Sequence, residues 1–203
     1  MGEVVRAGYD ALGPRFGAWA GRIRDPTRDR LTTELGSRLP EGARVLDLGC
    51  GFGALARLLA ERFELVGVDI SPEQLALARE AVPRATFVEA DFTTLELDEA
   101  SFDGVCALYS ITHVPREEHA GLFARIAGWL RPGGLFLASL SSRGSEDWTG
   151  EWLGVEMFFS GHDAETNRRL LREAGLELVH DEIATIEEPE GPADFLWVLA
   201  RKR

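Results

Sequence analysis

The chain is poor in lysine and cysteine, and it has no long apolar run. Its only lysine is Lys202, and the other basic residues are arginines, so chemistry that needs an internal lysine is excluded. Two cysteines, Cys50 and Cys106, cannot form a disulfide framework; both lie in apolar stretches and are expected to be buried thiols of a reducing compartment. No stretch approaches the ~20 apolar residues of a membrane span, and the charged first twenty residues do not resemble a signal peptide. We expect a soluble, cytoplasmic protein.

Basic charge is also scarce. The chain has 22 basic and 34 acidic residues, a formal net charge of −12. A field of that sign repels phosphate backbones and anionic membrane surfaces, so we expect neither nucleic acid nor membrane as a partner. The 203 residues are 45% apolar and 28% charged, which is typical of one globular domain and excludes disorder. We expect a single domain over residues 1–203.

The middle of the chain alternates short apolar runs with amphipathic stretches. The apolar runs predict strands at 43–49, 64–69, 85–91, 102–110 and 134–140. The stretches between them predict helices at 54–62, 72–81 and 116–130. Repeated strand–helix units give a parallel, doubly wound α/β sheet with right-handed crossovers.

The two ends of the chain differ from this pattern. Residues 3–39 predict helices, and residues 163–174 predict another, followed by strands at 176–186 and 194–202 that form an edge hairpin. The acidic turn between these strands, 187–190, is expected to be solvated. Residues 141–162 have no clear period but carry several large apolar side chains, so we interpret them as an irregular lid over an acceptor, or else as an extension of the core.

A glycine-rich turn is the strongest motif. Asp47 precedes Gly49-Cys50-Gly51-Phe52-Gly53 between a predicted strand and helix, and Asp69 ends the next strand. Glycines allow the backbone to approach a ligand closely. An acidic residue at the end of the second strand, here Asp69, can accept hydrogen bonds from ribose hydroxyls. The spacing also fits a dinucleotide. An acid beside a pyrophosphate is unfavourable, so Asp47 favours a nucleoside ligand that carries positive charge.

Five segments in order resemble the class I S-adenosylmethionine-dependent methyltransferases: VLDLGCGFG (45–53), VGVDIS (66–71), EADFTTL (89–95), SFDGVCALYSITHVP (101–115) and LRPGGLFLAS (130–139). The resemblance implies a Rossmann-like, doubly wound seven-stranded sheet, mostly parallel with an antiparallel C-terminal edge hairpin. It also implies S-adenosyl-L-methionine as cofactor and transfer of its methyl group to a small-molecule acceptor. Residues 1–40 would form an N-terminal helical cover.

The resemblance implies a role for each matching residue. The cofactor's amino-acid portion would meet Asp47 and the backbone of Gly49, Cys50, Gly51 and Gly53. The nucleoside would meet Asp69 at the ribose, Ile70 and Phe92 at the adenine ring, and Asp91 at the adenine amino group. Tyr109 would lie where the methionine end meets the substrate. Tyr9 and Trp19 belong to YDALGPRFGAW (9–19), which is similar to an N-terminal segment that covers the cofactor in many small-molecule methyltransferases.

Methyl transfer from a sulfonium depends mainly on holding the acceptor in line with the methyl group, and less on a set of catalytic side chains. A general base is needed only when the acceptor must lose a proton. His113 and His162 are candidate bases, and Tyr109 is a candidate contact to the reacting groups; His119 is expected on a solvated helix face. No spacing indicates a metal site. A cofactor-binding regulator or sensor without transferase activity and an NAD(P)-dependent oxidoreductase are the alternatives, and either a monomer or a homodimer fits the sequence.

Overall fold

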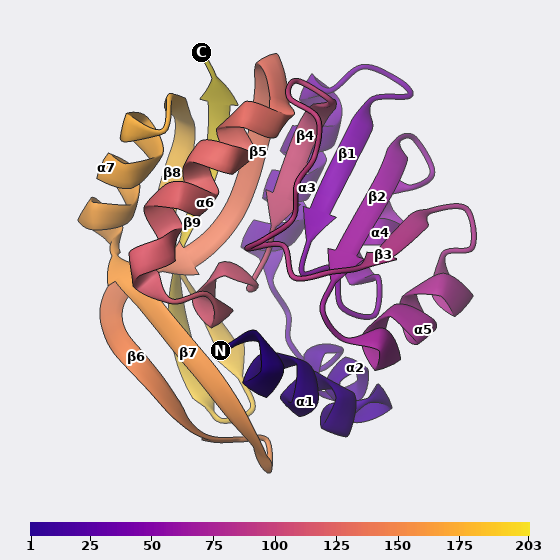
Figure 1. Ribbon diagram of the computed structural model, residues 1–203, viewed down its shortest axis with the longest axis vertical. Helices are drawn as coiled ribbons and strands as arrows, with labels where there is room; N and C mark the ends of the chain where they lie inside the picture. The colour runs from indigo at the N-terminus through magenta and orange to yellow at the C-terminus, as the bar shows by residue number, and fades with distance from the viewer.

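In the computed structural model, which describes residues 1–203, a seven-stranded sheet runs through the molecule in the order β3-β2-β1-β4-β5-β9-β8 (Figure 1). The five parallel strands are β1 (Arg44–Leu48), β2 (Glu64–Asp69), β3 (Thr86–Glu89), β4 (Phe102–Ala107) and β5 (Leu130–Ser141). The antiparallel pair is β8 (Leu176–Glu188) and β9 (Gly191–Lys202), with β9 next to β5. The predicted Rossmann-like sheet with an antiparallel C-terminal edge hairpin is confirmed.

Helices cover both faces of the sheet. On one face lie α3 (Pro26–Arg38) and α4 (Ala54–Leu59), and on the other lie α6 (His119–Trp129) and α7 (Ala164–Glu173) (Figure 1). The helix α5 (Pro72–Ala81) follows β2, and short 3₁₀ turns occupy Ile111–His113 and Arg116–Glu118. Asp25, Ser71 and Asp163 cap α3, α5 and α7 by accepting a backbone N–H bond. These caps fix where the loops turn back towards the sheet.

The N-terminal helices lie across the carboxyl ends of the parallel strands. Helix α1 (Gly2–Leu12) and helix α2 (Pro14–Ala20) are joined at Gly13. Figure 1 shows both below the sheet, with α1 beside a two-stranded ribbon formed by residues 143–163. A separate apolar cluster of Val5, Leu12, Met157 and Phe158 holds α1 against that ribbon. We call α1 and α2 the N-terminal cover.

The prediction that residues 141–162 are irregular is wrong. Residues 143–163 form a two-stranded antiparallel ribbon of β6 (Arg143–Trp152) and β7 (Val155–Asp163), which we call the ribbon. Its turn has positive φ at both Leu153 and Gly154, a turn that usually carries asparagine or aspartate at the first position. The register also shifts between Ser145 and Trp148. Both features hide the hairpin from its sequence.

Of two smaller predictions, the one for His119 is wrong and the one for the cysteines is confirmed. His119 is not solvated but 2% exposed, and its Nε2 lies 2.9 Å from the Val114 carbonyl oxygen, which accepts its hydrogen. Cys50 and Cys106 are buried free thiols. No helix of the chain has the length and apolar character needed to cross a bilayer.

The fit of α1 against the ribbon depends on Gly8. A Cβ at this position would lie 2.7 Å from Met157 Cε and 2.8 Å from the Glu156 carbonyl oxygen. We expect Gly8→Ala to push α1 off the ribbon, so that the amides of α1 exchange hydrogen faster and the melting temperature falls by several degrees. Hydrogen exchange with mass spectrometry measures the first effect.

Gly128→Ala in α6 is the matched control, since no atom lies within 4 Å of the added Cβ. A helix gains up to about 1 kcal/mol from this change, so the control keeps or raises stability. Unchanged exchange of α1 in Gly8→Ala would contradict the close approach.

Candidate functional site

The glycine turn joins β1 to α4 at the carboxyl edge of the sheet. Gly49, Gly51 and Gly53 have φ of 72°, 51° and 82°, values that glycine adopts without steric cost. A Cβ at Gly49 would also lie 2.3 Å from Ser110 Cβ. The turn therefore requires glycine both for its backbone shape and for its approach to the loop after β4.

Asp69 fixes this turn from the end of β2. Its Oδ2 accepts a hydrogen bond of 2.7 Å from Gly51 N, and its Oδ1 accepts one of 2.9 Å from Ser71 N. The carboxylate is 7% exposed, and burial raises its pKa despite these bonds. The same side chain that shapes the turn thus also faces the cavity described below.

Asp47 is buried beside it without a partner. It is 2% exposed, and its Oδ2 accepts no hydrogen bond. Burial, and secondarily the charge of Asp69, raises the pKa of Asp47 from 3.8 to about 7. A buried, unsatisfied carboxyl oxygen is costly, and an ammonium group of a ligand would satisfy it. This orphaned oxygen fits the amino-acid portion of S-adenosylmethionine.

A cavity of about 890 Å³ opens over the glycine turn. Its lining includes the following residues expected from the sequence: Tyr9, Trp19, Asp47, Gly49, Cys50, Gly51, Asp69, Ile70, Phe92, Tyr109 and His113. Phe16, Trp152 and Phe159 add aromatic walls from the cover and the ribbon. The structure thus gathers at one cavity residues from the glycine turn, three strand ends, the cover and the ribbon.

Three expected residues lie outside this lining. Gly53 is buried against α5, where a Cβ would lie 3.3 Å from Ala78. Asp91 Oδ1 accepts hydrogen bonds from Thr93 N and Thr93 Oγ1, at 2.8 and 2.7 Å. His162 lines a separate depression, and its Nε2 lies 3.0 Å from the Arg116 carbonyl oxygen. The structure does not bring His162 to the cavity that holds His113.

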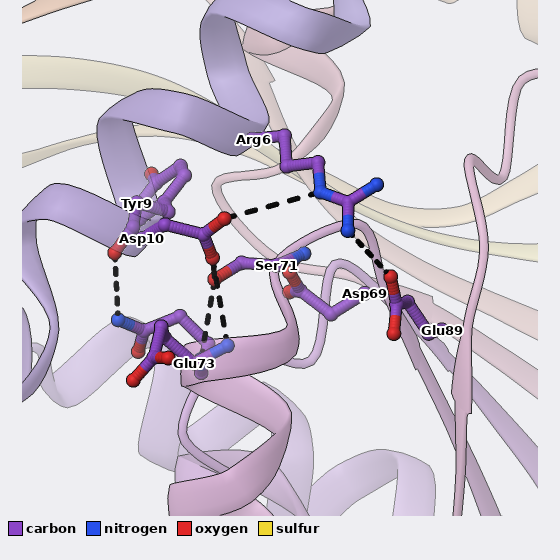
Figure 2. Close-up of polar contacts among 8 residues, drawn as sticks. Arg6, Tyr9, Asp10, Asp69, Ser71, Glu73 and Glu89 are labelled. Atoms are coloured by element: carbon purple, nitrogen blue, oxygen red, sulfur yellow. Dashed lines mark hydrogen bonds and ion pairs between the residues drawn. The ribbon is translucent and has the colours of Figure 1, made fainter.

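Polar contacts hold α1 over the end of β2 (Figure 2). Asp10 Oδ1 accepts a hydrogen bond of 2.6 Å from Ser71 Oγ. Arg6 lies between two carboxylates, at 3.9 Å from Asp10 and 2.8 Å from Glu89 (Figure 2). These residues link the cover to the cap of α5 and to β3. The helical spacing indicates the Arg6–Asp10 pair, but nothing in the sequence pattern pairs Asp10 with Ser71 or Arg6 with Glu89.

Gln74 makes a second link of this kind. From the sequence it is a capping-box residue of α5, but its Nε2 instead donates to the carbonyl oxygens of Tyr9 and Gly13, at 3.2 and 3.0 Å. Gln74 is fully buried. A glutamine in the first turn of a helix signals a cap, so its use as a clamp on α1 is visible only in three dimensions.

Tyr9 and His113 form a hydrogen-bonded pair at the cavity. The Tyr9 hydroxyl lies 2.9 Å from His113 Nε2, and His113 Nδ1 lies 2.8 Å from the Phe158 carbonyl oxygen. That carbonyl can only accept, so Nδ1 carries the hydrogen and Nε2 accepts from Tyr9. Burial lowers the pKa of His113 to about 4 and raises the pKa of Tyr9. Both groups are therefore neutral near pH 7.

Tyr109 points its hydroxyl away from the reacting end. The hydroxyl donates to Asp25 Oδ2, at the cap of α3, and the ring packs edge-on against Phe195 and Trp197. Its φ is +60°, which is uncommon for a residue with a side chain. Tyr109 thus lines the cavity while its hydroxyl is bonded to the cap of α3.

The fold and site together define a nucleoside-binding α/β protein of the Rossmann-like type, whose carboxylates suit a ligand with positive charge. Residues 45–134 match the family model described as a methyltransferase domain. The chain is 39% identical over 130 residues to trans-aconitate 2-methyltransferase of Variovorax paradoxus, covering 62% of this chain and 49% of that protein. It is 32% identical over 172 residues to phosphoethanolamine N-methyltransferase 1 of Triticum aestivum, covering 81% of this chain and 33% of that protein.

Among solved structures, it is similar to the 1,6-didemethyltoxoflavin-N1-methyltransferase of Burkholderia thailandensis, with a TM-score of 0.73 and 24% identity over 98% of this chain and 88% of that one. Residues 45–134 of this chain thus resemble a methyltransferase domain, and the chain has the fold of that solved enzyme. It spans about half or less of the length of the two curated relatives.

Asp47 gives the site a pH dependence that stability measurements can detect. With a pKa of about 7 in the folded protein against 3.8, Asp47 keeps a proton between about pH 4 and 7 that the unfolded chain has released. The free energy of unfolding therefore falls as pH rises through this window. We expect Asp47→Asn to remove this slope and to exceed the parent in stability at about pH 8, by up to about 4 kcal/mol.

Urea denaturation of the ligand-free protein at several pH values measures this difference. Asp98→Asn, at an exposed position, is the control and should follow the parent curve. An Asp47→Asn curve parallel to the parent would contradict the buried, unpaired state of the carboxyl group.

Proposed function

We propose that this protein transfers a methyl group from S-adenosylmethionine to a small-molecule acceptor. The observation that carries the proposal is the buried, unpaired Asp47 carboxyl group beside Asp69 in a cavity walled by the glycine turn. A pyrophosphate at this place would meet two carboxylates, whereas an amino group and ribose hydroxyls would be bonded by them. The family match supports the same ligand.

Different residues of the cavity bind different parts of the cofactor. Asp47 accepts hydrogen bonds from the amino group, and the glycine turn gives room for the amino-acid portion. Asp69 accepts from the ribose hydroxyls with the lone pairs that Gly51 and Ser71 leave free. Ile70 and Phe92, which line the cavity next to it, pack on the adenine ring. Bound S-adenosylmethionine supplies a methyl group activated by a positively charged sulfur.

Asp91 uses Oδ1 to hold Thr93 and orients the turn that carries Phe92, while its Oδ2 bonds no residue of the chain and is free for the adenine amino group. His162 is turned to the Arg116 carbonyl, and we leave it out of the reaction. Trp19 lines the cavity through the N-terminal cover and closes it against water.

Tyr9 and His113 handle the proton of the acceptor. Tyr9 donates to His113 Nε2, so the remaining lone pairs on the phenol oxygen are free to accept from an acceptor in the cavity. As the acceptor's proton reaches Tyr9, the Tyr9 proton passes to Nε2. The Phe158 carbonyl holds the ring in the tautomer that this transfer needs. Such proton transfer contributes about 10²–10⁴-fold, and the rest comes from orientation.

Calorimetry tests the cofactor assignment directly. We expect S-adenosylmethionine and S-adenosylhomocysteine to bind the parent protein, and NAD not to bind. A screen of metabolites that reads out S-adenosylhomocysteine then separates a transferase from a protein that only binds the cofactor. Binding of NAD alone would support the oxidoreductase, and cofactor binding without turnover on any metabolite would support the regulator.

Variants of the pair test the proton transfer. We expect Tyr9→Phe and His113→Gln to lower kcat on the acceptor found in the screen by about 10²-fold or more. Their affinity for S-adenosylhomocysteine should change less than about threefold, because neither group contacts the nucleoside in the proposed arrangement.

The pH profile of the parent adds an independent check. Because burial lowers the pKa of His113 to about 4, its Nε2 stays unprotonated above about pH 5. At saturating substrates we expect kcat to lack a limb near pH 6.5, the usual imidazole value. A limb there that disappears in His113→Gln would contradict the neutral, buried state of this ring.

A further inference from the structure

Aromatic rings from the cover and the ribbon surround one part of the cavity. Tyr9 lies edge-on to Phe16 with ring centroids 5.0 Å apart, and Trp152 lies 6.3 Å from both rings. Trp19 stacks on Phe16, and Phe159 lies edge-on to Trp152. These five rings, which we call the aromatic cage, all line the cavity. They lie on the side from which an acceptor must approach Tyr9 and His113.

The acidic turn after β8 adds negative charge to this side. It is not fully solvated as expected, because Trp19 Nε1 donates to Glu190 Oε2 at 2.9 Å and ties the turn to α2. Ile186 lines the cavity, and Glu188, two residues further along the same strand, lies on the same face of β8. Glu188 is half-buried and forms no ion pair with any residue of the chain.

The electrostatics around Glu188 point to a missing cation. Burial, and then the neighbouring Glu190, raises the pKa of Glu188, and the Glu188 charge contributes to the raised pKa of Tyr9. A half-buried carboxylate beside another carboxylate is stabilised by a positively charged ligand, and the faces of aromatic rings attract such a ligand as well.

The arginines that line the cavity come from another side. Arg28 lies in α3, Arg57 in α4, and Arg62 between α4 and β2. Arg28 and Arg62 pair with Asp29 and Glu41, whereas Arg57 forms no ion pair. The wall made by the cover, the ribbon and the acidic turn is therefore aromatic and anionic.

We propose that the acceptor is a small organic amine, held in its ammonium form by the aromatic cage and by Glu188. This inference rests on the proposed methyl transfer and names its substrate class. For the reaction one ammonium proton first goes to Tyr9 as Tyr9 passes its own to His113, which leaves a lone pair on nitrogen. This lone pair forms the new bond to the methyl carbon. The carbon–sulfur bond breaks, and its electron pair stays on sulfur.

Choline and its uncharged isostere 3,3-dimethylbutan-1-ol give a matched pair of probes, since they differ only in the replacement of the charged nitrogen by carbon. Calorimetry is carried out on the full-length protein saturated with S-adenosylhomocysteine. We expect choline to bind about tenfold more tightly than the alcohol, the ratio that a desolvated cation–π attraction provides. Equal binding of the two, or tighter binding of the alcohol, would overturn the proposal.

Two variants assign the preference to the named residues. Trp152→Leu should lower the affinity for choline about tenfold, and Glu188→Gln about threefold, while binding of the alcohol changes less in both. Glu187→Gln, at an exposed neighbour of Glu188, is the matched control. A control that loses as much choline affinity as Glu188→Gln would overturn the assignment.

Failure of this inference is distinguishable from failure of the proposed function. Absence of S-adenosylhomocysteine binding to the parent protein counts against the methyltransferase itself. Normal binding of S-adenosylhomocysteine with no preference for choline counts against the amine acceptor alone. If S-adenosylmethionine binds more than about tenfold tighter than S-adenosylhomocysteine, and Trp152→Leu removes that difference but not choline binding, the cage serves the sulfonium and the proposal is wrong.

Discussion

Two buried carboxylates at the ends of neighbouring strands govern this structure. Asp47 and Asp69 are 2% and 7% exposed, and no basic side chain pairs with either. Asp69 compensates for part of its burial by binding Gly51 N and Ser71 N, which is what shapes the glycine turn. Asp47 has no such compensation. The fold therefore keeps a site that is stabilised by a ligand with positive charge, and the free protein is less stable because of it.

The two walls of the cavity are built from different parts of the chain. The nucleoside side consists of strand ends and the glycine turn, which belong to the rigid sheet. The acceptor side consists of α1, α2, the ribbon and the turn after β8, held together by contacts such as Gly8 against Met157 and Asp10 against Ser71. The side proposed for the acceptor is thus held by contacts between separate elements, whereas the side proposed for the nucleoside belongs to the sheet itself.

The sequence predicted the half of the site that local rules determine. β2 and α5 were predicted with the bounds found, at 64–69 and 72–81, because continuous apolar runs and the Ser71 cap act over a few residues. The ribbon was missed because β6 is mostly exposed and polar, and because its turn uses Leu153 at positive φ. Its partner strand β7 packs on α1 and not on the main core. Such a hairpin lacks the apolar period that sequence analysis detects.

The contacts that define the acceptor side depend on tertiary structure and not on spacing. Tyr9 and His113 are 104 positions apart, and the docking of α1 through Gln74, Asp10 and the apolar cluster with the ribbon brings them together. His162 looked equivalent to His113 in the sequence, yet the ribbon turns it towards the Arg116 carbonyl and a different depression. The motif that identifies the cofactor carries no information on the acceptor, since the same scaffold accepts many. Substitutions in the cover and ribbon can therefore change the acceptor while Asp47, Asp69 and the glycine turn keep the donor.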